Sequence, residues 1–197
     1  MSDSPRIYLA RHGETAWTIS RQHTGRTDLP LTDGGRTEAE HVRQRLADRT
    51  VGSGSCPMPE HVFSSPLKRA HETCEIATGS ERITLLDDLM EWDYGDYEGL
   101  TTKEIQASRP DWNIFNDGSP GGESIVDVEA RADRVITRLR ALSAPEAFVF
   151  SHGHFLRVVM ARWLGQPVHS GSFFVLSTAA VVVLGYEHNL NEPCIRF

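Results

Sequence analysis

Apolar residues occur along the chain in two kinds of stretch, and each kind predicts a different element. Short apolar runs predict strands at about residues 7–10, 61–64, 83–86, 147–150, 173–176 and 179–184. Between them, apolar residues recur every three or four positions, which predicts helices at about 33–49, 66–77, 102–108, 124–142 and 155–164. Strands that alternate with helices indicate an α/β fold, a three-layer α/β/α sandwich with a mainly parallel central sheet.

Two of the predicted helices begin at recognisable caps, and two other stretches read as loops. Thr32 is a predicted N-cap, with Asp33 in the first turn that follows. Ser65-Pro66 predicts an N-cap with proline at the first helical position. Residues 51–59 are rich in glycine, serine and proline, and residues 91–100 are too irregular for a helix or a strand.

Length and charge limit the kind of protein this is. The 197 residues suggest one domain over 1–197. A formal net charge of -7 argues against nucleic acid or an anionic membrane as the main partner, although a local cluster of Arg and His can still bind a small anion. The start of the chain has no apolar signal region, and no apolar run is long enough to span a bilayer.

Three cysteines, Cys56, Cys74 and Cys194, are odd in number and match no metal-binding spacing. Reduced thiols in a cytoplasmic protein fit this pattern best. The sequence leaves the oligomeric state open, and a homo-oligomer is compatible with it.

Two predicted strands end in histidine motifs. The first runs into Arg11-His12-Gly13 and the strand at 147–150 runs into His152-Gly153-His154. In an open α/β sheet, ligands bind at the carboxyl ends of the strands, and parallel strands present those ends at one edge. We therefore expect the two motifs to meet in a binding site.

A cation and a carboxyl group join this candidate site. Arg69 lies in the first turn of a predicted helix, where its charge opposes the helix dipole unless an anion binds there. Glu91, beside Trp92 and Tyr94, is a candidate general acid because partial burial would disfavour its charged form. Other carboxylates in the same loop compete for this role, namely Asp93, Asp96 and Glu98.

Arginines, histidines and one carboxyl group together suggest phosphoryl transfer. Arg binds phosphate oxygens through bidentate hydrogen bonds, and a neutral histidine can act as a nucleophile. A metal site formed by His12, His152 and His154 is the competing interpretation. An arginine next to a would-be ligand disfavours it, because it repels a cation.

Five blocks of the chain, in order, resemble the histidine phosphatase superfamily, the phosphoglycerate mutase-like proteins. They are Leu9-Ala10-Arg11-His12-Gly13-Glu14-Thr15, Thr24-Gly25, Ser64-Ser65-Pro66-Leu67-Lys68-Arg69-Ala70, Glu91-Trp92-Asp93-Tyr94-Gly95 and Ser151-His152-Gly153-His154. The resemblance implies a phosphoglycerate mutase-like fold and an enzyme that requires neither metal nor cofactor.

The resemblance also implies roles for single residues. His12 would become phosphohistidine, while Arg11, Arg69 and His152 would hold the transferred phosphoryl group. Glu91 would protonate the leaving oxygen, and it or a neighbouring carboxylate would then assist water. The implied substrate-binding positions are Arg11, Thr18, Thr24, Gly25, Arg69, Tyr94, His152 and Arg157.

Within the superfamily, the sequence favours a phosphatase over a mutase. Thr18 stands where the mutases have asparagine, and their substrate-gripping Arg-Arg pair has no counterpart between Leu100 and Gly122. The later blocks are similar to those of sedoheptulose-1,7-bisphosphatase-like enzymes and bacterial acid phosphatases, in which an arginine at the place of Arg157 contacts the substrate. We expect a hydrolase of small phosphorylated metabolites; the alternatives are a cofactor-dependent mutase and an inactive phosphate-binding scaffold.

Overall fold

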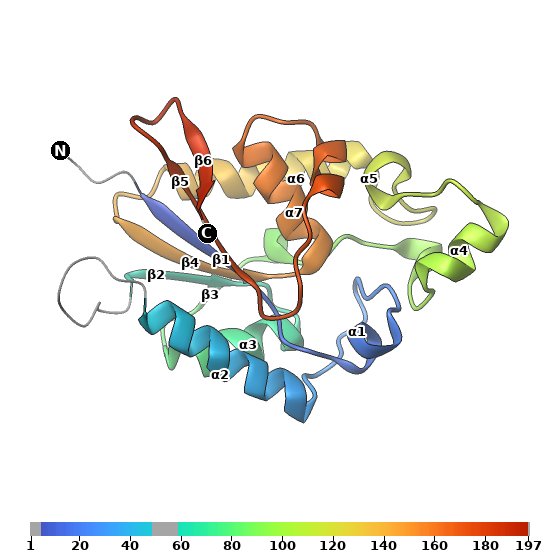
Figure 1. Ribbon diagram of the computed structural model, residues 1–197, viewed down its shortest axis with the longest axis horizontal. Coiled ribbons are helices and arrows are strands. Elements are labelled where there is room, and N and C mark those ends of the chain that lie inside the picture. The colour runs from blue at the N-terminus through green and yellow to red at the C-terminus, as the bar shows by residue number, and fades with distance from the viewer. Residues whose placement is uncertain (1–4, 49–58, 197) are drawn as a thin grey trace.

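A single six-stranded sheet organises the molecule. The computed structural model describes residues 5–48 and 59–196, in which the strand order is β3-β2-β4-β1-β5-β6 (Figure 1). The strands β1 to β4 run parallel, while β5 and β6 run antiparallel to their neighbours. Their bounds are Arg6–Arg11 (β1), His61–Ser64 (β2), Thr84–Leu85 (β3), Glu146–Ser151 (β4), Val181–Tyr186 (β5) and Pro193–Arg196 (β6).

Helices cover both faces of this sheet, so the predicted three-layer α/β/α arrangement is confirmed. In Figure 1 α2 and α3 lie below the sheet, and α6 and α7 lie above it. The α-helices are Ala16–Ser20 (α1), Asp33–Ala47 (α2), Lys68–Thr78 (α3), Thr102–Ser108 (α4), Ile114–Asp117 (α5), Ile125–Arg140 (α6) and Gly153–Trp163 (α7). Three short 3-10 helices span Asp87–Leu89 (η1), Gly95–Tyr97 (η2) and Val168–Phe173 (η3).

Alternate residues of β1 pack into different halves of the core. Ile7 and Leu9 belong to the hydrophobic cluster that α6 and α7 complete. Tyr8 and Ala10 belong to a second cluster, which contains Val42 of α2 and other side chains from α2 and α3. Because successive side chains of a strand point to opposite faces, one apolar strand fills both layers.

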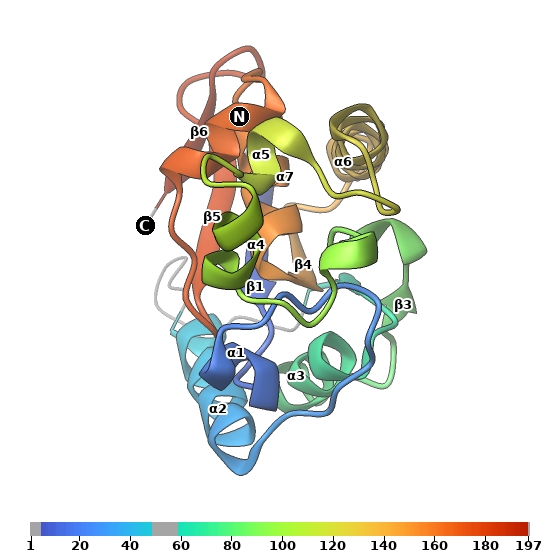
Figure 2. The same cartoon turned by 90° about the vertical axis from the view of Figure 1, so that its right-hand side faces the viewer.

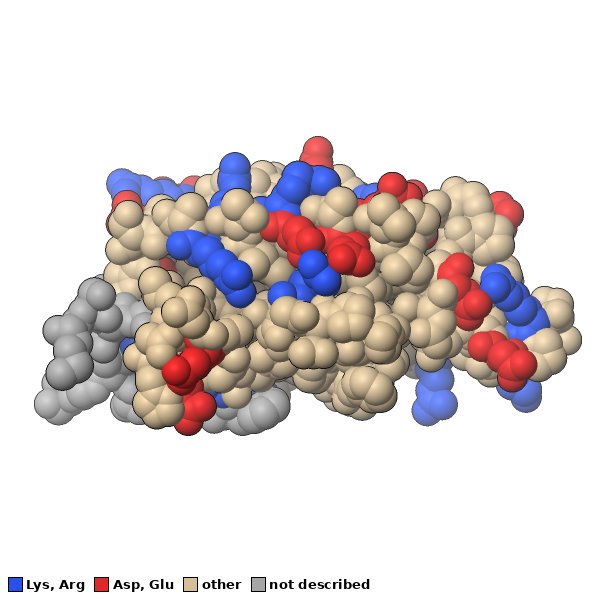
Figure 3. All heavy atoms as spheres, turned by 90° about the horizontal axis from the view of Figure 1, so that it is seen from above, with Lys and Arg blue, Asp and Glu red and all other residues tan. Residues whose placement is uncertain are grey.

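The helix α6 shows how the sequence pattern sets the outer layer. Its predicted apolar stripe faces the core, and Ser124 caps its first turn through a reciprocal bond with Asp127. Its polar side carries ion pairs such as Arg162 Nε to Asp133 Oδ1, at 2.9 Å. Figure 3 shows acidic and basic side chains next to each other on the face seen from above. Within residues 5–48 and 59–196, no helix is long and apolar enough to cross a membrane.

Near the C-terminus, one prediction of secondary structure is wrong and one strand was not predicted. The predicted strand at 173–176 is the last residue of η3 followed by an irregular segment, with Phe173 and Val175 exposed and only Leu176 buried. The Leu176 carbonyl accepts a hydrogen bond from Arg11, and among the described residues this segment is not part of the sheet. A strand that the pattern did not predict, β6, pairs with β5 as a hairpin. The predicted loop at 51–59 lies, apart from its last residue, outside the described residues.

A close approach of two glycines fixes the loop that follows β1. A Cβ atom on Gly13 would lie 2.3 Å from the carbonyl oxygen of Gly35, and a Cβ on Gly35 would lie 2.2 Å from that of Glu14. Thr32 supports the same contact, since it caps α2 and its hydroxyl donates to Glu14 Oε1. The start of α2 is therefore pressed directly against the loop that carries His12.

We predict that Gly35→Ala destabilises the protein by about 1–3 kcal/mol, because the added methyl group meets backbone that cannot move aside. The matched control is Gly34→Ala, whose methyl group would meet no backbone closely: its nearest atom is Glu14 Oε1, the end of a side chain, at 2.8 Å. Since alanine has the better helix propensity, this control should change the free energy of unfolding by no more than about 1 kcal/mol. Urea denaturation of both variants checks the prediction, and equal losses would contradict it.

Candidate active site

Two histidine side chains meet where β1 and β4 end. Arg11 is the register partner of Ser151, so the next residue of each strand leaves the sheet at the same level. The rings of His12 and His152 are 5.2 Å apart between centroids, and both are buried. The parallel pairing thus brings together the two motifs that the sequence placed at strand ends.

The hydrogen bonding of His12 leaves one ring nitrogen free. Its Nδ1 lies 2.7 Å from the carbonyl oxygen of Gly13. A carbonyl can only accept, so Nδ1 carries the proton and Nε2 keeps its lone pair. Burial, assisted by the charges of Arg69 and Arg11, holds the pKa of His12 well below its ordinary value of 6.5. The ring is therefore neutral and able to act as a nucleophile through Nε2.

A pocket of about 250 Å³ opens over His12. Seven of the residues proposed from the sequence line it, namely Arg11, His12, Thr18, Thr24, Glu91, Tyr94 and Arg157. The other three, Gly25, Arg69 and His152, lie outside its lining. Among the four carboxylates that the sequence left as candidates for the acid, only Glu91 is part of the lining.

The Arg11 side chain lines the pocket close to the start of α7. Its Nη1 donates to the Leu176 carbonyl at 2.5 Å, and its guanidinium lies so close to Gly153 that a Cβ there would be 3.1 Å from Cζ. Its Nε is buried and has no hydrogen-bond partner among the described residues. Because a buried N–H without an acceptor is costly, this group favours a ligand that supplies an anionic oxygen.

Arg69 and His152 form a hydrogen-bonded pair next to His12. Arg69 Nε donates to His152 Nδ1 at 3.2 Å, so the His152 Nε2–H donates to Ser65 Oγ at 2.8 Å. The remaining Arg69 donors bond the carbonyl oxygens of Thr24, Gly25 and Thr27. Through these bonds Arg69 holds the loop that follows α1 in place. A contact between Arg69 and a phosphoryl group stays a prediction.

The start of α3 differs from the expected cap. Its N-cap is Leu67, two residues after the predicted Ser65, although Ser65 Oγ accepts from the Leu67 N–H at 3.3 Å as well as from His152. The Lys68 N–H donates instead to Asp28 Oδ1 at 2.7 Å. The anion expected at this helix end is therefore a carboxylate of the protein itself.

Glu91 is buried and caps α7 from outside that helix. Its Oε1 accepts from the backbone N–H groups of Trp92 and Phe155, at 2.9 and 2.8 Å, and its Oε2 accepts from that of His154 at 3.1 Å. The N-cap residue of α7 offers no side-chain bond, so Glu91 takes its place. Oε2 accepts only one of these bonds and keeps the capacity to carry a proton.

A second buried arginine holds the chain on which Glu91 lies. Arg131 of α6 donates to the carbonyl oxygens of Asp88, Met90 and Glu91, at 3.0, 2.6 and 3.2 Å. It also forms a bidentate pair with Glu123, at 2.7 Å for both bonds. Arg131 therefore positions Glu91 through its backbone, without contact with the pocket.

The far wall of the pocket is aromatic. The Tyr94 hydroxyl lies 2.5 Å from His154 Nδ1, and the His23 ring lies 4.8 Å from that of Tyr94. Burial raises the pKa of Tyr94 well above 10.0, holds that of His154 well below 6.5 and lowers that of His23 to about 4. Arg157 completes this wall, with its guanidinium 4.4 Å above the Phe115 ring.

Two of the predicted substrate-binding residues form hydrogen bonds within the protein. The Thr18 hydroxyl donates to the Thr15 carbonyl and accepts from the Thr15 N–H, in a capping box at the start of α1. The Gly25 N–H donates to both carboxylate oxygens of Glu98. Their contact with a substrate stays a prediction.

Sequence reasoning missed several lining residues, namely Trp17, Arg21, Gln22, His23 and Leu176. Most lie on α1 and the turn after it, which packs beside α4 through the bridge between Gln22 and Thr101 (Figure 2). Proximity to the motif at 11–15 was the one signal that could have found them. Leu176 was assigned to a strand instead.

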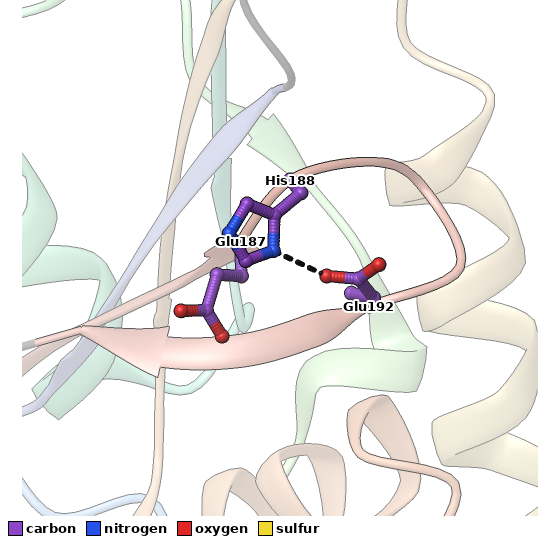
Figure 4. A group of neighbouring side chains, drawn as sticks. All are labelled: Glu187, His188 and Glu192. Carbon is purple, nitrogen blue, oxygen red and sulfur yellow. Dashed lines mark hydrogen bonds and ion pairs between the residues drawn. The ribbon is translucent and has the colours of Figure 1, made fainter.

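The three histidines considered for a metal do not form a ligand set. Their ring nitrogens face Gly13, Arg69, Ser65 and Tyr94. Within the described ranges, the group with metal-ligand spacing is Glu187, His188 and Glu192 (Figure 4). This group lies in the exposed turn after β5. Because β5 runs antiparallel to β1, that turn is at the end of the strands opposite the pocket.

Comparison with known proteins identifies the family. Residues 7–193 match the histidine phosphatase superfamily (branch 1). An acid phosphatase of Mycobacterium tuberculosis is 42% identical over 193 residues, covering 96% of this chain and 91% of the relative. A sedoheptulose 1,7-bisphosphatase of Saccharomyces cerevisiae is 32% identical over 230 residues, covering 97% and 83%.

The fold comparison agrees. A solved structure of an open reading frame product from Mycobacterium tuberculosis superposes with a TM-score of 0.88 at 39% identity, covering 98% of this chain and 96% of the other. The chain therefore belongs to the histidine phosphatase superfamily. The predicted superfamily, fold class and enzyme class are confirmed.

We predict that stability falls as the pH drops below about 6.5, because His12, His23, His152 and His154 have lowered pKa values in the folded protein. The unfolded chain binds protons at these rings below its own pKa of about 6.5, whereas the folded protein keeps them neutral. Urea unfolding between about pH 7 and pH 5 should show a decline, with His23→Gln reducing its slope by about one proton.

Nitrogen NMR of the histidine rings provides the direct check. The His12 ring should remain neutral through this range, with its proton on Nδ1. A His12 ring that becomes protonated near pH 6.5 would contradict the lowered pKa, and a neutral ring with its proton on Nε2 would contradict the tautomer inferred from the Gly13 carbonyl.

Proposed function

We propose that this member of the histidine phosphatase superfamily hydrolyses small phosphomonoesters through a phosphohistidine on His12. The neutral His12 ring carries this proposal, because His12 lines the same pocket as Arg11, whose Nε has no partner among the described residues. The nucleophile and a phosphate-binding donor therefore already stand together. One relative is named an acid phosphatase, which supports phosphate hydrolysis, and the other a sedoheptulose 1,7-bisphosphatase, which supports a phosphorylated sugar as substrate.

In the first step, Nε2 attacks the phosphorus atom and the bond to the leaving oxygen breaks. Glu91 gives its proton from Oε2 to that oxygen, so the product departs as an alcohol. The Nδ1–H bond to the Gly13 carbonyl stabilises the positive charge that develops on the ring. Arg11 neutralises charge on the phosphoryl oxygens.

In the second step, water attacks the phosphohistidine and the bond between phosphorus and nitrogen breaks. The Glu91 carboxylate takes the proton from that water, which restores both residues and releases phosphate. Arg69 and His152, which the sequence assigned to phosphoryl binding, keep His12 and the loop of Thr24 in place, and we retain a phosphoryl contact as part of the proposal.

A mutase, which would use the same chemistry, is the second candidate function, and Thr18 argues against it. In place of a mutase asparagine the chain offers a hydroxyl that the Thr15 backbone already occupies. An inactive scaffold is less compatible with the site, because Arg11, His12 and Glu91 are all present and brought to one pocket.

The proposal includes the cellular setting predicted from the sequence. Both hydrophobic clusters pack on one sheet, which supports a single domain over the described residues. Cys74 and Cys194 are free thiols, which supports a cytoplasmic location.

We predict that His12→Ala lowers turnover of p-nitrophenyl phosphate at least about a thousandfold, since it removes the nucleophile. Rapid denaturation of the wild type during turnover should trap acid-labile phosphate on His12. Label on another residue, or near-normal turnover by the variant, would refute the mechanism.

We predict that Glu91→Gln slows the hydrolysis of alkyl phosphates about 100- to 10,000-fold, the usual contribution of a general acid. Loss on p-nitrophenyl phosphate should be far smaller, because its leaving group needs little protonation. The ratio of the two losses is the measurement, since any damage to the α7 cap affects both substrates alike. Equal losses would remove Glu91 from the acid role.

A further inference from the structure

Arg21 occupies a backbone position that disfavours its side chain. It follows α1 as the C-cap, with φ 64° and ψ 27°, in the left-handed region. Residues with a Cβ pay a steric cost there, which is why glycine is usual at helix ends of this kind. Elsewhere this chain follows the rule, since α3 ends at Gly79 and Gly165 follows α7, both with positive φ.

The backbone alone does not account for an arginine at this position. The cap bond runs from the Arg21 N–H to the Trp17 carbonyl, and a glycine would make the same bond with less strain. Strained residues that persist tend to mark functional sites. The reason for arginine should therefore lie in its side chain.

That side chain is a cation at the pocket with no bonding partner among the described residues. Arg21 lines the pocket over His12 and is exposed. Across residues 5–48 and 59–196, no hydrogen bond, ion pair or ring contact engages its guanidinium. The other pocket arginines differ, because Arg11 is bonded to the Leu176 carbonyl and Arg157 to the Gly171 and Ser172 carbonyls.

We propose that Arg21 binds a second anionic group of the substrate, remote from the phosphoryl group that His12 attacks. The substrate class is then a small phosphomonoester that carries another phosphate or a carboxylate. A free guanidinium offers such a group charge-assisted, bidentate hydrogen bonds. The pocket of about 250 Å³ suits a metabolite of this size. This inference rests on the proposed phosphatase function.

Matched substrate pairs test it. Fructose 1,6-bisphosphate and fructose 6-phosphate differ by one phosphate, and 3-phosphoglycerate and glycerol 3-phosphate differ by a carboxylate. In Arg21→Gly, the KM of the doubly anionic member should rise about tenfold or more relative to its partner, the usual effect of losing a charge-assisted bond. Arg21→Lys should restore part of the difference.

Two controls separate binding from folding and from net charge. Arg21→Gly should melt no lower than the wild type, because glycine accepts the left-handed conformation. Arg82→Gly removes an equal charge from an exposed position outside the pocket and should leave the KM ratios unchanged.

The outcomes are distinct. A changed ratio in the phosphate pair alone identifies a second phosphate, and in the carboxylate pair alone a carboxylate; either supports the proposal. Unchanged ratios in both pairs, or equal KM increases within a pair, overturn it. Failure of the phosphatase function itself would appear separately, as wild-type protein that does not hydrolyse p-nitrophenyl phosphate.

Discussion

β1 and β4 pair in parallel with Arg11 opposite Ser151, and the arrangement of the site depends on that register. A slip of one residue would turn every side chain of one strand to the other face of the sheet. His12 and His152 would then leave the sheet on different sides. The two-sided core prevents such a slip, because Tyr8 and Leu9 are each buried in a different cluster. The packing that stabilises the fold is therefore also what places the nucleophile.

Burial and positive charge act on His12 together. A histidine beside Arg11 and Arg69 loses its own proton readily, since a third cation in a buried site is unfavourable. The same arginine, Arg11, keeps a buried N–H without a partner. In the proposed reaction, a phosphate would offset the charge of the two arginines and supply an acceptor for the unpaired Arg11 Nε. The site is thus arranged for an anion in advance of binding.

The sequence predicted those parts of the structure that depend on local pattern. The apolar run into Arg11-His12-Gly13, the stripe of α6 and the Thr32 cap each follow from residues close together in the chain. Predictions failed where a distant group overrides the local preference. Around Ser65 the hydroxyl is shared between the Leu67 N–H and the distant His152, and α3 begins only after Leu67; in 173–176 the Leu176 carbonyl is bonded by the distant Arg11. The left-handed conformation of Arg21 could not be read from a residue type that rarely adopts it.

Glu91 shows why the chemistry and the selectivity of the site are set by different parts of the molecule. Its carboxylate links the loop after η1 to α7, and its backbone carbonyl is bonded by Arg131. Its position is therefore fixed by long-range contacts. His12 is fixed in the same way, by the sheet and by the contact between Gly13 and Gly35. Arg21, by contrast, follows a five-residue helix as its C-cap, and no hydrogen bond or ion pair within residues 5–48 and 59–196 holds its guanidinium. In the role proposed for Arg21, a change there would alter which ester is bound and would leave Arg11, His12 and Glu91 where they are.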